Sequence, residues 1–284
     1  MLTLAIQKSG RLSEKTLSLL KDCGIEFNNG GTVKLKTVSK NFPLTLLFLR
    51  DDDIPECVDD EIADAGIVGE NIYFEKKKPL IVEEKLGYAK CRLSIAVPRN
   101  ESFNSVQDLN DKKIATTYPN ILKTFLRENK INAVIHEING SVEIAPGIGL
   151  SDAIFDIVST GSTLLSNGLK EVYTVTTSEA VLVKNKKLTS EKERLLEKLL
   201  FRIRSVNKAH ANKYILLNAP DKAIDKICDI LPGIKSPTIM PLAQEGWSSI
   251  HSVIQQDDFW EIIEQLKYAG AEGILVIPIE QMIG

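Results

Sequence analysis

Short apolar runs bounded by turn residues alternate with helical patterns along the first 205 residues of this chain. Several runs have the length of a buried strand, and they lie at 2–6, 44–50, 64–69, 91–98 and 180–184. Helical patterns follow or separate them, one opening near Ser13, one over 121–130 and one over 190–210. Because strands that alternate with helices usually pair side by side, we expect an α/β fold with largely parallel sheets.

The order of elements in the middle of the chain indicates a particular kind of α/β protein. VQDL (106–109), then KIAT (113–116), then a turn and a helix is a pattern typical of two-lobed binding proteins, whose ligand lies between two similar lobes. The run at 180–184 and the helix after it are expected to return the chain to the first lobe. We therefore expect lobe I to comprise 1–90 and 180–210, and lobe II to comprise 91–179.

The pattern changes after residue 210. Strand, helix, strand, strand, helix and strand follow one another over about 70 residues, which is the ferredoxin-like βαββαβ plan. We expect residues 211–284 to form a separate C-terminal domain.

Composition and charge indicate which classes of binding partner this chain is suited to. The chain has 284 residues, 35 basic against 38 acidic, and a formal net charge of -3, which favours neither nucleic acid nor an anionic membrane as a partner. The four cysteines lack the spacing of a zinc site or a redox pair. The N-terminal apolar run is too short for a signal peptide or a membrane span, so we expect a cytoplasmic protein.

The stretch IFDIVSTGST (154–163) carries the most informative chemistry. A strand leads into a turn with one glycine and four hydroxyls, and a helix follows; this arrangement presents free backbone N–H groups to an anion such as phosphate. The same turn also occurs as an ordinary helix cap without a ligand. Asp156 favours the first interpretation, because a carboxylate in an apolar strand is costly unless it is paired or faces a cleft.

Glu143 is a second acid, expected at a strand end 13 positions before Asp156. Two carboxylates beside a phosphate-binding turn describe a site for a phosphorylated sugar, in which the acids hold vicinal hydroxyls or Mg²⁺. A solvated acid at the end of a strand is the alternative for Glu143.

These residues resemble the signature of the ATP phosphoribosyltransferase family, the first enzymes of histidine biosynthesis. The matching positions are Glu143, Gly149, Ser151, Ile154, Asp156, Ile157, Thr160, Gly161, Thr163 and Leu164. QKSGRL (7–12), RDDDIP (50–55), DAGIVGEN (64–71), IATTYPN (114–120) and SPTIMPL (236–242) are also similar to segments of the long form of the family. The resemblance implies a periplasmic-binding-protein type II-like catalytic body with an ACT-like regulatory domain, a hexamer exchanging with dimers, and a requirement for Mg²⁺.

The resemblance also implies a reaction and its ligands: N1 of ATP joins C1 of 5-phosphoribosyl 1-pyrophosphate (PRPP), and pyrophosphate leaves. We assign Glu143 and Asp156 as catalytic residues and as candidate metal ligands. The 5-phosphate of PRPP is assigned to Ser159, Thr160, Gly161, Ser162 and Thr163. ATP and pyrophosphate are assigned to Lys8, Gly10, Arg11, Arg50, Glu70, Asn71 and Tyr118.

Several of these assignments have structural alternatives. Lysines and arginines in a first loop are often solvated surface charges, and Tyr118 is as well suited to packing a hinge as to contacting adenine. The acids Asp51, Asp52 and Asp53 are suited to capping a helix, and we expect one of them to bind metal or nucleotide as well.

The C-terminal domain is expected to bind L-histidine as a feedback inhibitor. The segments similar to the family's effector site contain Asn218, Thr238, Ala271 and Gly273. Asn218 stands where some relatives have an aspartate, so the contact with the ammonium group of histidine lacks that charge.

A non-catalytic protein is the main alternative function. A two-lobed solute-binding protein would usually carry an export signal, and an amino-acid sensor would be expected to have lost the acid pair or the STGST turn. The N-terminus shows no such signal, and both catalytic features are intact.

Overall fold

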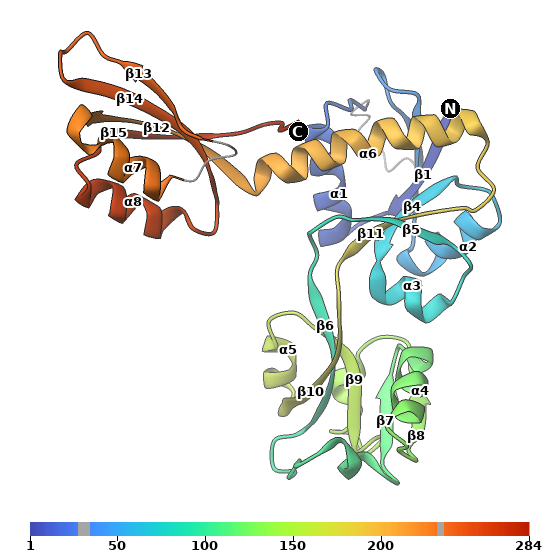
Figure 1. Ribbon diagram of the computed structural model, residues 1–284. Coiled ribbons are helices and arrows are strands. Elements are labelled where there is room, and N and C mark those ends of the chain that lie inside the picture. Colours follow the sequence, from blue (N-terminus) through green and yellow to red (C-terminus); the bar gives the residue numbers. More distant parts are fainter. Residues whose placement is uncertain (28–34, 232–235, 284) are drawn as a thin grey trace. The chain divides into compact units, whose positions relative to one another are not determined.

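A computed structural model describes residues 1–27, 35–231 and 236–283. The chain divides into two units, Met1–Lys21 with Ile25–Leu196 and Asp22–Gly24 with Glu197–Gly284. The first unit contains a six-stranded and a five-stranded sheet, and the second contains a four-stranded sheet (Figure 1). Among the described residues, none of the helices has the length and apolar character needed to cross a bilayer.

The six-stranded sheet and its helices are called lobe I here. Its strand order is β2-β3-β1-β4-β11-β5. The elements are β1 (Leu2–Gln7), α1 (Arg11–Asp22), β2 (Lys36–Val38), β3 (Leu44–Leu49), the 3-10 turn η1 (Asp51–Asp53), α2 (Ile54–Asp59), β4 (Ala65–Gly69), α3 (Glu70–Lys76), β5 (Ile81–Lys85) and β11 (Ala180–Lys184). β1 runs parallel to β3 and β4, so the carboxyl ends of these three strands share one edge.

The five-stranded sheet and its helices are called lobe II. Its strand order is β10-β6-β9-β7-β8, with β7, β8 and β9 parallel. The elements are β6 (Cys91–Pro98), η2 (Val106–Leu109), β7 (Lys113–Thr116), α4 (Pro119–Glu128), β8 (Val134–Glu137), η3 (Val142–Ile144), β9 (Ala153–Val158), α5 (Ser162–Ser166) and β10 (Leu169–Ser178).

Two segments of the chain connect the lobes, and their paths change the strand directions expected in the sheets. The stretch after β5 leads into lobe II, and the end of β10 leads back into β11. The two stretches are hydrogen-bonded, with Leu86 N donating to Ala180 O and Ala180 N donating to Tyr88 O, both at 2.9 Å. Because β11 enters lobe I from the opposite end, it lies antiparallel to β4 and β5. Five of the nine strand pairs described in the two lobes are antiparallel, so the expectation of largely parallel sheets is wrong and both sheets are mixed.

The second unit contains most of the long helix and the C-terminal sheet. Its strand order is β13-β14-β12-β15, and every described pair is antiparallel. Two helices pack against one face of this sheet, and the apolar core lies between them and strands β12 and β14. The elements are α6 (Ser190–His210), β12 (Asn212–Pro220), η4 (Asp221–Ala223), α7 (Ile224–Ile230), β13 (Thr238–Pro241), β14 (Trp247–Gln255), α8 (Phe259–Tyr268) and β15 (Glu272–Pro278). This order confirms the predicted ferredoxin-like βαββαβ plan.

Candidate active site

Asp156 lies in β9, where the three preceding residues are fully buried and Asp156 itself is half-buried. Burial raises the pKa of Asp156 to about 6, and the nearby charge of Glu143 acts in the same direction. Hydrogen bonds from the Ile157 backbone N–H, at 2.8 Å, and from the Thr117 side chain oppose this rise in pKa. The carboxylate is therefore partly deprived of water and placed beside a second acid.

The sequence suggested that Glu143 ends a strand, but the structure places it in the 3-10 turn η3. The turn follows Gly140, at φ 79°, and Ser141, at φ 50°, both in the left-handed region. This sharp reversal brings Glu143 close enough to Asp156 to affect its titration. The structure thus brings together the two acids that the sequence singled out.

The STGST turn joins β9 to the short helix α5 at the carboxyl edge of lobe II. Gly161 has φ +79° and precedes α5, a conformation that a residue with a side chain adopts only with strain. Thr160 Oγ1 lies 3.0 Å from Ser162 Oγ and accepts a long hydrogen bond, 3.5 Å, from the Ser162 backbone N–H, while Gly161, the N-cap residue of α5, has no side chain to cap the helix. The first N–H groups of α5 and the exposed hydroxyls of Ser159, Thr160, Ser162 and Thr163 can therefore bind an anion.

Arg92 of β6 holds the start of this turn, a contact that sequence reasoning missed. Its Nη1 donates to the backbone oxygen of Ser159 at 3.0 Å, while Nε and Nη2 donate to the two carboxylate oxygens of Glu171 in β10. Ser94 Oγ donates to the same carboxylate at 2.7 Å. The hydrogen bonds from Arg92 lower the pKa of Glu171 below its ordinary range. An arginine near the start of an apolar strand is only a weak signal for this cluster, because its partners Ser159 and Glu171 are 67 and 79 residues away.

The cations assigned to phosphate groups lie at the carboxyl edge of lobe I. Lys8 follows β1, and its backbone N–H donates to Leu49 O at 2.8 Å, so the loops after β1 and β3 are adjacent. Gly10, at φ +93°, precedes Arg11, the first residue of α1. The side chains of Lys8, Arg11 and Arg50 are exposed and form no ion pair with the residues that the structure describes. They remain available to an anionic ligand.

Asn71 and Tyr118 meet between the lobes. Asn71 Nδ2 donates to the Tyr118 hydroxyl at 3.2 Å, and Ser178 Oγ donates to Asn71 Oδ1 at 2.9 Å. The Asn71 side chain folds back over Gly69, where an added Cβ would lie 2.3 Å from Asn71 Oδ1. Glu70, by contrast, forms an ion pair with Lys85 at 2.9 Å. Asn71 is therefore built into the lobe junction, and Glu70 is engaged within lobe I.

Tyr118 links the acids of the two lobes. Burial raises the pKa of its hydroxyl well above the ordinary value, and the charges of Asp156 and Asp51 contribute to that rise. Because both charges act on this hydroxyl, Asp51, which follows β3 in lobe I, and Asp156 of lobe II lie near the same tyrosine.

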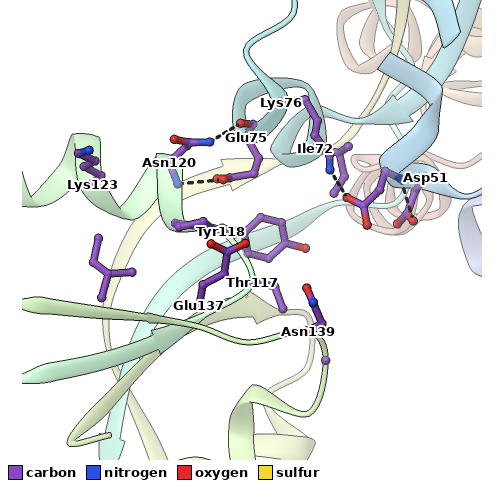
Figure 2. A pocket seen from close by; sticks show the side chains of 14 residues that line it. Asp51, Ile72, Glu75, Lys76, Thr117, Tyr118, Asn120, Lys123, Glu137 and Asn139 are labelled. Atoms are coloured by element: carbon purple, nitrogen blue, oxygen red, sulfur yellow. Dashed lines mark hydrogen bonds and ion pairs between the residues drawn. The ribbon is translucent and has the colours of Figure 1, made fainter. Parts of the chain in front are cut away.

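A cavity of about 670 Å³ opens between the lobes beside Tyr118 (Figure 2). Its wall includes Asp51, Asp52 and Lys76 from lobe I, and Thr117, Lys123, Glu137 and Asn139 from lobe II. Asp52 pairs with Lys76 at 3.2 Å, and neither η1 nor α2 has a side-chain cap. The Asp51–Asp53 turn therefore places two acids in the cavity wall, and Asp51 Oδ1 also accepts from the backbone N–H of Asp52 at 3.1 Å, as the capping alternative expects.

The candidate effector residues fall into two groups on the C-terminal sheet, one on β12 and β15 and the other on β13. Asn218 is paired with β15, and its Nδ2 lies 3.5 Å from where a Cβ on Gly273 would be. Ala271 precedes β15 on the same side. Thr238 lies on β13, the opposite edge strand, where it pairs with His251. Within one chain, Asn218, Ala271 and Gly273 are brought together and Thr238 is not.

Comparison with known proteins identifies the family. The model described as ATP phosphoribosyltransferase matches residues 50–205, and the model described as the HisG C-terminal domain matches residues 209–281. An ATP phosphoribosyltransferase of Cytophaga hutchinsonii is 59% identical over 99% of this chain and 98% of that protein. One from Bacteroides thetaiotaomicron is 54% identical over the full length of both.

Solved structures agree with the fold. The ATP phosphoribosyl transferase (HisG:HisZ) complex from Thermotoga maritima matches with a TM-score of 0.61 and 31% identity, over 72% of this chain and 99% of that chain. A substrate-binding protein of an amino acid ABC transporter has a TM-score of 0.50 at 12% identity, over 73% of this chain and 93% of that chain, a likeness of fold alone. The predicted two-lobed body is thereby confirmed, and the chain belongs to the ATP phosphoribosyltransferase family.

Proposed function

We propose that this chain transfers the phosphoribosyl group of PRPP to N1 of ATP, with release of pyrophosphate, in the first step of histidine biosynthesis. Family membership over the whole chain supports the reaction class. The observation that carries the proposal for the site is the juxtaposition in lobe II of Asp156, Glu143 and the exposed hydroxyls of the STGST turn. A solute-binding role would explain the fold but not this acid pair.

The chemistry requires positioning more than it requires a nucleophile from the protein. The lone pair of adenine N1 attacks C1 of the ribose while the bond from C1 to the pyrophosphate oxygen breaks, so positive charge develops at C1. A carboxylate such as Asp156 near the ribose stabilises that charge. The STGST turn holds the 5-phosphate, and the two substrates are aligned for attack.

The cations of lobe I are suited to the polyphosphate groups. Lys8, Arg11 and Arg50 lie on adjacent loops at one sheet edge and have no competing ion pair among the described residues. They would bind the triphosphate of ATP or the departing pyrophosphate. Asn71 and Tyr118, at the lobe junction, would contact the adenosine portion.

The donor set fits Mg²⁺ bound mainly through substrate oxygens. No group of three or more His, Cys, Asp or Glu side chains suited to a metal occurs in the described part of the chain, and the acid pair offers two carboxylates. Mg²⁺ in phosphate-handling sites commonly uses one or two carboxylates together with phosphates and water. Asp156 and Glu143 would hold the ion, whose role when bound is to neutralise pyrophosphate charge.

Feedback inhibition by histidine is proposed for the C-terminal unit. Asn218 on β12 lies beside Ala271 and Gly273 at the β15 edge of the sheet, whereas Thr238 lies at the opposite edge, on β13. A site that used all four would combine edges from two copies, which supports a homo-oligomer, proposed here as a hexamer exchanging with dimers. Calorimetric titration with histidine and light scattering with and without it test both parts of this proposal; no binding would remove the regulatory role.

A further inference from the structure

Glu75, in the last turn of α3 in lobe I, is 7% exposed and contacts lobe II directly. Its Oε1 accepts from the backbone N–H of Asn120 at 2.8 Å, and its Oε2 accepts from the backbone N–H of Ile121 at 3.0 Å. The Asn120 side-chain Nδ2 donates to the backbone oxygen of Glu75 at 3.1 Å. Figure 2 shows the two hydrogen bonds between Glu75 and Asn120 beside Tyr118. The last turn of a lobe I helix is thus joined to the first turn of a lobe II helix.

The contact supplies what α4 lacks. The first turn of a helix has N–H groups without intrahelical partners, and a side chain near the N-terminus usually accepts from them. In α4 the N-cap residue, Tyr118, makes no such bond, and Pro119 has no N–H. Glu75 satisfies two of these groups and places a negative charge at the positive end of the helix. A cap from lobe II itself would serve α4 equally well, but it would not connect the lobes.

The position of Glu75 on α3 connects this cap to the candidate active site. Asn71 lies four residues before Glu75, so both side chains lie on the same face of α3. Asn71 binds the hydroxyl of Tyr118, while Glu75 binds the helix turn that begins directly after Tyr118. One helix of lobe I therefore holds both the hydroxyl of Tyr118 and the helix turn that follows Tyr118 in lobe II.

We propose that Glu75 is a positioning residue that fixes the cleft geometry of the transferase by capping α4 across the lobes. This inference rests on the proposed function. The acid pair and the residues assigned to the 5-phosphate of PRPP all lie in lobe II, while the cations assigned to ATP and the departing pyrophosphate lie in lobe I. Loss of the cap should consequently leave PRPP binding intact and impair the alignment of ATP with it.

The test uses the full-length protein with Glu75→Ala and Glu75→Gln, and with Glu128→Gln as the control. Glu128 is an exposed glutamate at the other end of α4. We expect both Glu75 variants to bind PRPP with Mg²⁺ within about twofold of the parent by calorimetry, while kcat falls at least about tenfold and KM for ATP rises. Acetate should partly restore kcat in Glu75→Ala, because it can occupy the vacated cap, and it should not affect the parent.

Hydrogen exchange provides a readout that does not depend on activity. Peptides covering the first turn of α4 should exchange faster in both Glu75 variants than in the parent, and their exchange rate should be unchanged in Glu128→Gln. The proposal would be overturned if the Glu75 variants exchanged at the same rate as the parent in this turn, or if they had the same kcat as an active parent. Loss of PRPP binding together with ATP binding would also overturn it, because Glu75 would then support the fold generally. If the parent makes no product, the proposed function fails, and exchange alone decides whether Glu75 caps α4.

Discussion

Replacing Asp156 with asparagine should remove activity and stabilise the fold at neutral pH. Burial, with Glu143 nearby, raises the pKa of Asp156 from an ordinary 3.8 to about 6, so ionisation of this carboxylate opposes folding. A difference of this size corresponds to at most about 3 kcal/mol of unfolding free energy, reduced by the solvent that reaches a half-buried group. Asparagine keeps an oxygen that can accept the Ile157 N–H. We expect a gain of about 1–3 kcal/mol at pH 7.5.

The pH dependence of this gain identifies its cause. Asp156 binds a proton more tightly in the folded than in the unfolded protein, so its destabilising effect develops as pH rises from about 4 to about 6 and is constant above that. At pH 4.5 the advantage of Asp156→Asn should fall to roughly one third of its value at pH 7.5. The first unit is large enough that each kcal/mol moves the melting temperature by about 2–4 °C.

The assay is thermal unfolding of the parent, Asp156→Asn and the exposed control Asp60→Asn at pH 4.5 and 7.5, beside kcat/KM at pH 7.5. Asp156→Asn should melt higher at pH 7.5 and lose activity by orders of magnitude, and Asp60→Asn should match the parent in both. The reasoning would be refuted if Asp156→Asn were less stable than the parent at pH 7.5, equally stabilised at both pH values, or as active as Asp60→Asn.

Three further substitutions test separate parts of the site. Arg92→Lys keeps the charge opposite Glu171 but loses the fork that reaches the turn, so KM for PRPP should rise about fivefold in steady-state kinetics; an unchanged KM would contradict the anchoring role. Tyr118→Phe removes the hydroxyl bonded to Asn71, so KM for ATP should rise several-fold while PRPP affinity measured by calorimetry stays constant; equal losses for both substrates would count against its assignment. Gly273→Val introduces a side chain at φ +56° near Asn218, so histidine inhibition should weaken at least about tenfold with kcat retained; undiminished inhibition would place the effector elsewhere.

Much of the fold follows from local pattern in the sequence. The strand at Cys91–Pro98, the strand at Ala180–Lys184 and the helix Ser190–His210 begin and end where the alternation of apolar and polar residues predicted. Each has a long apolar run or a clear helical period, and such a local pattern is sufficient to predict the element. The direction of β11 was not predictable in this way, because it depends on the path of the chain through lobe II.

The residues of the site were predictable from sequence only where they lie together in one short segment. Asp156 and the STGST turn are neighbours in sequence, so an oddly placed acid beside a glycine and hydroxyls was a usable signal. Glu75 and Arg92 gave little signal, because their partners are 45 and 67 residues away. A glutamate in a helical pattern is ordinarily a solvated residue, and only the tertiary fold shows that Glu75 is buried against another helix.

The central claim is that this chain joins ATP to PRPP. The most direct measurement is to incubate the full-length protein with ATP, PRPP and Mg²⁺, and to follow pyrophosphate release together with the mass and NMR spectrum of the nucleotide. The account predicts stoichiometric pyrophosphate and an adenine ribosylated at N1, with both abolished in Asp156→Asn. Hydrolysis of PRPP without a nucleotide adduct, or no reaction in the parent protein, would contradict it.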